Sequence, residues 1–314
     1  LVPAEQSVAE NDAIPEDIAQ EMKEMGLFGL SILEQYGGLG LTMEEEALVA
    51  FEIGHTSPAF RSLFGTNNGI GAQGILIDGT EEQKNKYVPK LATGEVISSF
   101  CLTEPDAGSD AASLKTRAEK DGDFYVLNGT KRFITNGPEA NLYTVMARTD
   151  PDNKGAGGIT AFIVENAWPG FSVTPIPVMR SYYPGQIFFD NVRVPNRNVL
   201  GEPHKGWDIL ANKLLSRLRI PYAAANLGVS VAAHRMAVDY STTRETFGAP
   251  LSTRQAIQWM LVDSEVEIRA CRWLIWDAAW KFDAGEDYRQ AAAIAKLYSS
   301  DVLSHAVDRS IQIH

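Results

Sequence analysis

The run Phe100-Cys-Leu-Thr-Glu-Pro-Asp-Ala-Gly-Ser-Asp110 is the most informative stretch of this chain. It begins as a β-prone segment and then meets two residues that favour turns, Pro105 and Gly108. A strand that ends in such a turn can present the hydroxyls of Thr103 and Ser109, with their neighbouring amides, to a ligand. These hydroxyls can also satisfy local backbone groups, which is their commoner role.

A second run, Lys131-Arg-Phe-Ile-Thr-Asn-Gly137, follows farther along the chain. Side chains alternate between the two faces of a strand, so Phe133 and Thr135 are predicted to share one face. That pattern places an aromatic ring beside a hydroxyl. Because the two runs complement each other, we interpret them as one site.

Length and composition predict a globular protein. The 314 residues are 45% hydrophobic and 22% charged, enough to build the cores of about two or three domains. The chain has neither an apolar run long enough to span a bilayer nor a signal-peptide pattern, so we expect a soluble, unexported protein with no membrane partner. The net charge of −12 disfavours nucleic acid as a partner.

Two cysteines, Cys101 and Cys271, lie far apart in the sequence, which is typical of a reducing compartment. We expect the cytoplasm, or the mitochondrial matrix in a eukaryote. The histidines have no metal-ligand spacing, so no metal site is expected. The chain opens on Leu1-Val-Pro and stops at Ile311-Gln-Ile-His314, and we expect it to be a fragment truncated at both ends.

Residues 1–97 are predicted to form an N-terminal helical domain. Two capping boxes mark helix starts there: Thr42 with Glu45, and Thr80 with Gln83. The first of these helices is expected to end near Gly54, in a left-handed cap. The glycines of Gly69-Ile-Gly71-Ala-Gln-Gly74 match a dinucleotide fingerprint, but no βαβ unit surrounds them. Close packing of helices is the preferred interpretation.

Residues 98–200 are predicted to form a small, β-barrel-like domain, with turns at Asp121-Gly122 and Asn128-Gly129. The segments 124–127 and 131–135 flank the second turn and predict a hairpin. The segments 159–164 and 186–194 add further strands. Residues 201–314 return to a helical period over 207–240, 251–284 and 288–314, which predicts an antiparallel bundle. The expected fold class is α+β.

The two runs quoted above resemble the acyl-CoA dehydrogenase family, and the order of helices, β-domain and bundle resembles its fold. Phe133-Ile-Thr135 is similar to a Trp-Ile-Thr of the family, with a Phe that keeps a flat ring and loses an N–H donor. The resemblance implies FAD as cofactor. It implies that FAD is bound by Phe100, Cys101, Leu102, Thr103, Gly108, Ser109, Phe133, Ile134 and Thr135, with Ser109 also at the substrate.

Another resemblance concerns Arg244-Glu-Thr-Phe-Gly248 with Gln255, and also Gln312 near the end of the sequence. In the family these positions reach the FAD of a neighbouring subunit, where an arginine grips pyrophosphate. The resemblance implies that Arg244, Thr246, Phe247, Gln255 and Gln312 bind cofactor in a homo-oligomer, usually a tetramer. Without the resemblance, the segment reads as a charged helix end closing at Gly248.

Candidate substrate residues are Ser216, Arg219 and Arg61. Ser216-Arg-Leu-Arg219 is similar to the family's substrate-contacting turn and would orient the thioester; otherwise it is a solvated basic turn. Arg61-Ser62 resembles the pair that grips a distal carboxylate in glutaryl-CoA dehydrogenases, although an arginine fork also caps helices. The segment 177–186 is about two residues shorter than the family's corresponding loop, which affects the acyl pocket.

The resemblance implies conversion of an acyl-CoA to a trans-2-enoyl-CoA, with the α-proton going to a glutamate, the β-hydride going to FAD, and electrons passing to an electron-transfer flavoprotein. The glutamate is expected beyond His314, because Leu218 occupies the alternative position on the helix, so no catalytic residue is assigned. Three alternatives stay open: a decarboxylating, glutaryl-CoA-like enzyme, an oxidase, and a catalytically idle relative that binds FAD or acyl-CoA.

Overall fold

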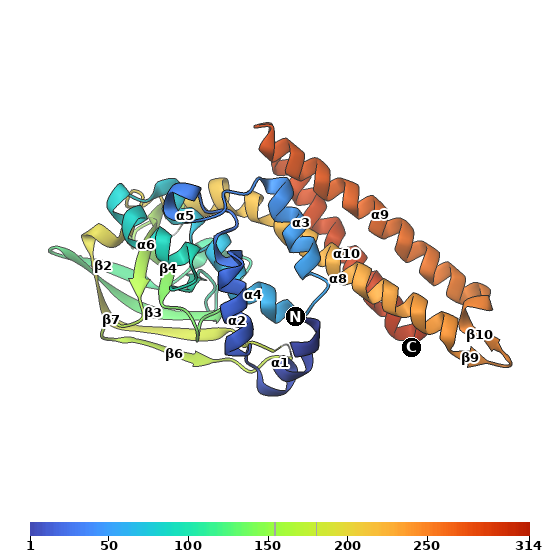
Figure 1. Cartoon of the computed structure of the whole chain (residues 1–314). Coiled ribbons are helices and arrows are strands. Elements are labelled where there is room, and N and C mark those ends of the chain that lie inside the picture. The colour runs from blue at the N-terminus through green and yellow to red at the C-terminus, as the bar shows by residue number, and fades with distance from the viewer. Residues whose placement is uncertain (154, 180) are drawn as a thin grey trace. The chain divides into compact units, whose positions relative to one another are not determined.

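The computed structural model describes residues 1–153, 155–179 and 181–314 (Figure 1). The chain forms two compact units. The first comprises residues 1, 3–40 and 62–215, and the second comprises residues 2, 41–61 and 216–314. In the described residues, no helix is both long and apolar enough to cross a membrane.

The first unit combines short helices with a sheet. Its α-helices are α1 (Glu5–Asn11), α2 (Glu16–Glu24), α5 (Gln73–Asp78), α6 (Glu81–Ala92) and the short α7 (Gly206–Asp208), while α4 (Pro58–Asn68) continues into it from the second unit. The expected capping box is present at the start of α6, where the side chains of Thr80 and Gln83 each accept from the other's backbone N–H. The helices expected in the N-terminal part of the chain are therefore confirmed.

Eight strands form one sheet in the described part of this unit, in the order β6-β7-β3-β2-β4-β5-β8, with β1 paired to β4. Its core contains large buried side chains such as Tyr143 and Phe162. The strands are β1 (Ser98–Cys101), β2 (Arg117–Asp121), β3 (Phe124–Ile134), β4 (Leu142–Arg148), β5 (Ile159–Glu165), β6 (Phe171–Pro175), β7 (Gly185–Pro195) and β8 (Val199–Leu200). The expected turn at Asp121-Gly122 joins β2 to β3.

The hairpin expected at Asn128-Gly129 is wrong. Strand β3 runs straight through this dipeptide, and its register against β7 shifts between Leu127 and Gly129. A Cβ on Gly129 would lie 2.5 Å from the Thr116 hydroxyl, so glycine is needed for close approach and not for a tight turn. Thr116 lies next to β2, opposite Gly129 in the register that the turn at Asp121-Gly122 sets.

The segment 177–186 joins β6 to β7, and Arg180 in it lies outside the described residues. Next to it, the amide of Ile176 donates to Pro184 O at 2.8 Å. Tyr182 in this segment is buried and has a left-handed φ of 68°.

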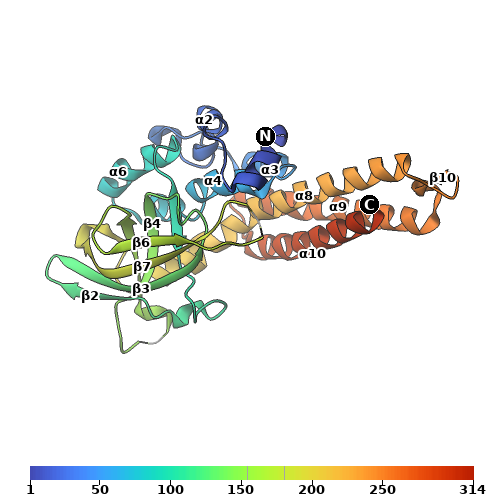
Figure 2. The ribbon, with the colours of Figure 1, turned by 90° about the horizontal axis from the view of Figure 1, so that it is seen from below.

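The second unit is helical. It contains α3 (Met43–Ile53), α8 (Leu215–Thr243, whose first residue belongs to the first unit), α9 (Gln255–Asp283) and α10 (Arg289–Ile313). A π-helical stretch of the first unit, Ile209–Leu214, leads into α8. Helix α9 turns back beside α8, and α10 turns back again (Figure 1, Figure 2). Their buried faces share one apolar cluster with α3. The antiparallel bundle and the capping box of Thr42 with Glu45 are confirmed.

Helix α3 ends next to Gly54, as expected, but the left-handed cap is wrong. Gly54 has φ −59° and ψ −19°, which any residue adopts. A Cβ there would lie 2.4 Å from Ala225 O, and one on Gly228 would lie 2.1 Å from Phe51 O. The two glycines therefore let α3 and α8 touch backbone to backbone.

We predict that Gly228→Ala destabilises the protein by about 1 to 3 kcal/mol, because the added methyl overpacks the contact between α3 and α8. This outcome opposes helix propensity, which favours alanine by about 1 kcal/mol. The measurement is urea unfolding followed by circular dichroism. The control is Ala293→Leu on the exposed face of α10, expected within about 0.5 kcal/mol of the parent. A Gly228→Ala variant as stable as the parent would contradict the packing argument.

Candidate functional site

The loop after β1 is closed by its own backbone. The amide of Glu104 donates to Ala107 O at 3.0 Å, which forms the turn expected around Pro105. Beyond the turn, Gly108 and Ser109 are exposed, and a Cβ on Gly108 would meet nothing within 4 Å. The loop therefore presents an open, exposed edge after a hydrogen-bonded turn.

The structure brings the two sequence runs together. The Ser99 hydroxyl donates to Thr135 O at 2.6 Å, and the amide of Arg132 donates to Thr103 O at 2.8 Å. One of these bonds is donated from β1 and the other from β3, so the loop after β1 and the end of β3 form one continuous edge. The prediction that they act together has a structural basis in these contacts.

The expected alternation of Phe133 and Thr135 is wrong. The register of β3 against β7 shifts between Lys131 and Ile134, Phe133 takes a left-handed φ of 57°, and Thr135 lies beyond the end of the strand. The bulge turns the Phe133 ring outward, where it is 53% exposed and lies 5.0 Å from the Arg132 guanidinium. A bulky residue in this conformation is strained, which is typical of ligand-binding positions.

Asn136 fixes the backbone just after this edge. It is fully buried with φ 58°, and its amide nitrogen donates to Ser62 O at 2.8 Å, Leu63 O at 3.2 Å and the Thr66 hydroxyl at 2.7 Å. Asparagine tolerates the left-handed region better than most residues. The end of the second run is therefore tied to the first unit's helix α4.

Sequence reasoning missed a buried ion pair beneath the edge. Lys131 Nζ lies 2.8 Å from Glu104 Oε1, and both side chains are almost completely buried. Burial alone would raise the pKa of Glu104, but the Lys131 charge and hydrogen bonds from Thr116 and Lys115 together lower it below its ordinary value. The signal in the sequence is Lys131 itself, a lysine within an expected strand. It lies two residues before Phe133, so strand alternation assigns both side chains to the same face.

Several groups at the edge fit a flat, polar cofactor. The Phe133 ring is exposed, and among the described residues none accepts a hydrogen bond from the amide or hydroxyl of Thr103, or from the hydroxyl of Thr135. Cys101 and Ile134 are buried, so they can offer only backbone atoms. Burial also raises the pKa of the Cys101 thiol, against the effect of Lys131, which keeps it neutral.

A second buried ion pair lies next to Ser216, one of the candidate substrate residues of the second unit. Ser216 is buried on α8, and the adjacent Arg217 donates to Glu46 Oε2 at 2.8 Å. Arg61 lies 5.0 Å from the centre of the Tyr222 ring. The carboxylate of Glu46 is therefore already paired with Arg217. Arg219, one turn along from Ser216, is partly exposed.

The segment after α8 differs from the expected helix end at Gly248. Helix α8 stops at Thr243, and a hairpin of β9 (Glu245–Thr246) and β10 (Ala249–Pro250) follows. Phe247 and Gly248 form its tip, both with left-handed φ, and the Phe247 side chain is fully exposed. The glycine therefore serves a hairpin turn.

The hairpin and the last turn of α10 lie at one end of the second unit. The His314 ring stacks on Tyr240 with their centres 4.4 Å apart, and Tyr240 O accepts from the amide of Arg244 at 2.8 Å. Gln312 is exposed beside this contact, and Gln255 is exposed at the start of α9. The structure thus gathers the expected second set of cofactor residues near one end.

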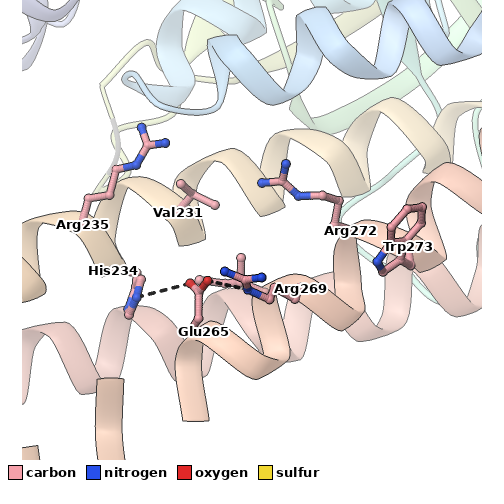
Figure 3. Close-up of a pocket in the computed structure, with 8 residues that line it drawn as sticks. Val231, His234, Arg235, Glu265, Arg269, Arg272 and Trp273 are labelled. Carbon is pink, nitrogen blue, oxygen red and sulfur yellow. Dashed lines mark hydrogen bonds and ion pairs between the residues drawn. The ribbon is translucent and has the colours of Figure 1, made fainter. Parts of the chain in front are cut away.

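A groove of about 490 Å³ lies between α8 and α9 (Figure 3). Glu265 crosses it, accepting from Arg269 Nε at 2.6 Å and lying 3.5 Å from His234 Nε2. Burial lowers the pKa of His234, against the effect of Glu265. The remaining lining residues are Val231, Arg235, Ile268, Arg272 and Trp273, none of them a residue expected at the cofactor or substrate.

Comparisons with known proteins cover the chain from end to end. Models of the N-terminal, middle and C-terminal domains of acyl-CoA dehydrogenase match residues 1–95, 99–192 and 204–314. An acyl-CoA dehydrogenase of Bacillus subtilis strain 168 is 38% identical to the chain, and the alignment covers 100% of the chain and 83% of that relative.

Two solved structures are similar over the same extent. Butyryl-CoA dehydrogenase from Megasphaera elsdenii has a TM-score of 0.94 at 36% identity, covering 100% of this chain and 83% of that one. A chain from a study of the electron transferring flavoprotein of Acidaminococcus fermentans and flavin-based electron bifurcation has a TM-score of 0.94 at 37% identity, with the same coverage.

We predict that Glu104→Gln destabilises the protein by about 3 kcal/mol or more at pH 7, because it leaves the Lys131 charge buried without its partner. The pKa of Glu104 is lowered in the folded state, so the parent's advantage is complete above about pH 4.5, the usual range for an unfolded glutamate. It should be lost as the pH falls through the folded pKa.

The measurement is urea unfolding of both proteins from pH 7 to pH 3. Glu119→Gln is the control, because Glu119 pairs with Arg117 on the exposed surface and should change stability by less than about 1 kcal/mol. A constant difference between parent and Glu104→Gln across this range would show that the carboxylate does not titrate as described.

Proposed function

Since the chain belongs to the acyl-CoA dehydrogenase family of FAD-dependent oxidoreductases, we propose that the edge formed by residues 100–109 and 133–135 binds the FAD with which it dehydrogenates an acyl-CoA. The observation that carries this assignment is the joining of the two runs through Ser99 and Thr135, beside half-buried polar groups of Thr103 and Thr135 that donate to none of the described residues.

The reaction removes two hydrogens from the acyl chain. A proton leaves the α-carbon to a base, a hydride leaves the β-carbon, and a trans-2 carbon–carbon double bond forms between them. FAD, when bound, supplies the hydride acceptor. We propose that a glutamate acts as the base; none of the described glutamates is assigned this role.

We propose that the chain's own residues contribute binding and orientation. The amide and hydroxyl of Thr103 and the hydroxyl of Thr135 supply donors at the edge, and the exposed Phe133 ring covers a flat ligand. Ser109, at the open end of the loop, serves cofactor phosphate and acyl-CoA. Ser216 and Arg219 on α8 orient the thioester, whose carbonyl needs strong donors as negative charge develops on it.

We further propose that Arg244, Thr246, Phe247, Gln255 and Gln312 bind the FAD of a neighbouring copy in a homotetramer. Arg244 is exposed and makes no ion pair with any described residue, so its guanidinium is available for a phosphate. The fully exposed Phe247 ring near it offers a flat apolar surface to the same ligand.

The remaining parts of the proposal rest on the sequence. We propose three domains with limits at residues 1–97, 98–200 and 201–314, a cytoplasmic location, and an electron-transfer flavoprotein as the acceptor of the electrons. The two cysteines are buried and free, a state that suits a reducing compartment.

A dicarboxylic acyl-CoA is a second candidate substrate, and one contact favours it. Arg61 lies over Tyr222, and the carboxylate near it, Glu46, is bonded to Arg217. Burial lowers the pKa of Arg61, partly offset by Tyr222 and Glu46. A guanidinium with reduced solvation and no carboxylate of its own is suited to a substrate carboxylate.

Anaerobic titration of the purified flavoprotein with acyl-CoA thioesters tests the function. We predict that saturated straight-chain, branched or dicarboxylic thioesters bleach the main flavin absorption band and yield the enoyl-CoA. If dicarboxylic thioesters are the substrates, Arg61→Met should weaken their binding by roughly tenfold or more through the loss of one charged pair, so that bleaching requires a correspondingly higher concentration. An unbleached flavin with all three classes would favour the idle, binding-only alternative.

We predict that Arg244→Ala lowers FAD occupancy, because the loss of one charged hydrogen-bonding group costs about 1.5 to 3 kcal/mol. Dialysis followed by the ratio of flavin to protein absorbance measures it. Arg289→Ala is the matched control, since Arg289 is also exposed and pairs with Asp287 just before the start of α10. Equal occupancy in the Arg244 variant and the parent would remove this residue from the cofactor site.

A further inference from the structure

The buried ion pair holds more than two side chains. Besides Glu104, Lys131 Nζ donates to the carbonyl oxygen of Leu102 at 3.0 Å. Lys131 is completely buried, so water does not weaken this charged hydrogen bond. The Lys131 ammonium on β3 therefore holds the loop after β1 at two points, the carboxylate of Glu104 and the backbone carbonyl of Leu102.

The carboxylate of Glu104 is held from a third segment. The amide of Lys115 donates to Oε2 at 2.6 Å, and the amide of Thr116 donates to Oε1 at 2.9 Å. With Lys131, three donors satisfy this carboxylate, which keeps it charged despite its burial. Burial lowers the pKa of Lys131, and the charge and hydrogen bond of Glu104 act against that effect. The carboxylate of Glu104 thus favours the ammonium form of Lys131.

The Leu102 carbonyl belongs to the same peptide group as the Thr103 amide. A cation that hydrogen-bonds to a peptide oxygen draws electron density from the whole group, which makes its N–H a stronger donor. No described residue accepts a hydrogen bond from the Thr103 amide. The strengthened donor is thus left for a ligand at the candidate cofactor edge.

We propose that Lys131 is a positioning residue for FAD: through the Leu102–Thr103 peptide it orients and strengthens an amide donor that favours the reduced, more electron-rich form of the cofactor. This inference rests on the proposed function, since it assumes FAD at this edge. Glu104 keeps Lys131 charged and in place. The pair therefore tunes the cofactor without touching it.

The test compares FAD affinity and midpoint potential in four variants. Lys131→Met should weaken FAD binding at least tenfold and make the midpoint potential more negative. Each tenfold loss in the preference for reduced over oxidised FAD corresponds to about 30 mV for a two-electron couple. Lys131→Arg should recover much of both properties. Affinity is measured by adding FAD to deflavinated protein, and the potential by reductive titration against a reference dye.

The double variant Lys131→Met with Glu104→Gln guards against loss of folding, because it removes both buried charges and its one amide oxygen still accepts from one of the amides of Lys115 and Thr116. It should keep the shift to a more negative potential. Lys115→Met is the matched control: this lysine lies on the same loop system, but its side chain is exposed and pairs with the exposed Asp106. The FAD affinity and midpoint potential of Lys115→Met should match those of the parent.

The outcomes separate the inference from the function on which it rests. If the parent binds no FAD, the proposed function fails. If the parent binds FAD and the folded double variant has the parent's potential, the inference is overturned while the function stands. A loss of thermal stability with an unchanged potential would give Lys131 a structural role only, and would also overturn it.

Discussion

The contact between Lys131 and Glu104 is the constraint on which the candidate site depends. Both groups are buried, and an isolated charge in such a place is costly. Each therefore requires the other, and the loop after β1, the bulged end of β3 and the backbone at residues 115–116 must adopt the one arrangement that brings them together. The loop has few degrees of freedom left, which preorganises its exposed donors for a ligand.

Irregular backbone at the end of β3 places the functional groups beyond the regular part of the sheet. A bulge and a left-handed Phe133 turn an aromatic ring outward at the end of β3, and a left-handed Asn136 ties the following turn to α4 through three hydrogen bonds. Bulges commonly redirect side chains beside functional sites. The strain is tolerated because buried polar contacts on both sides determine the conformation. The site is thus an edge of the sheet, built by departures from the strand pattern.

Local signals predicted the elements well, and non-local contacts explain the failures. Both capping boxes, the long helices and the turn at Asp121-Gly122 depend on neighbouring residues, and the structure contains them. The prediction at Gly54 fails because this glycine leaves room for Ala225, which lies far away in the sequence. The prediction at Gly129 fails because this glycine leaves room for Thr116 across the β2–β3 hairpin and does not form a turn. Lys131 was overlooked because a lysine is normally exposed; only the position of Glu104 in space explains its burial. The joining of the two site runs was predicted, whereas the geometry of Phe133 was not.

Hydrogen exchange of the backbone amides, with and without FAD, tests most directly whether residues 100–109 and 133–135 form the cofactor edge. Deflavinated protein is compared with FAD-loaded protein, and peptides covering both segments are followed by mass spectrometry. The account predicts that FAD slows exchange in both segments together, including the amide of Thr103, which has no acceptor among the described residues. Slowed exchange elsewhere in the chain, with both segments unchanged, would contradict it.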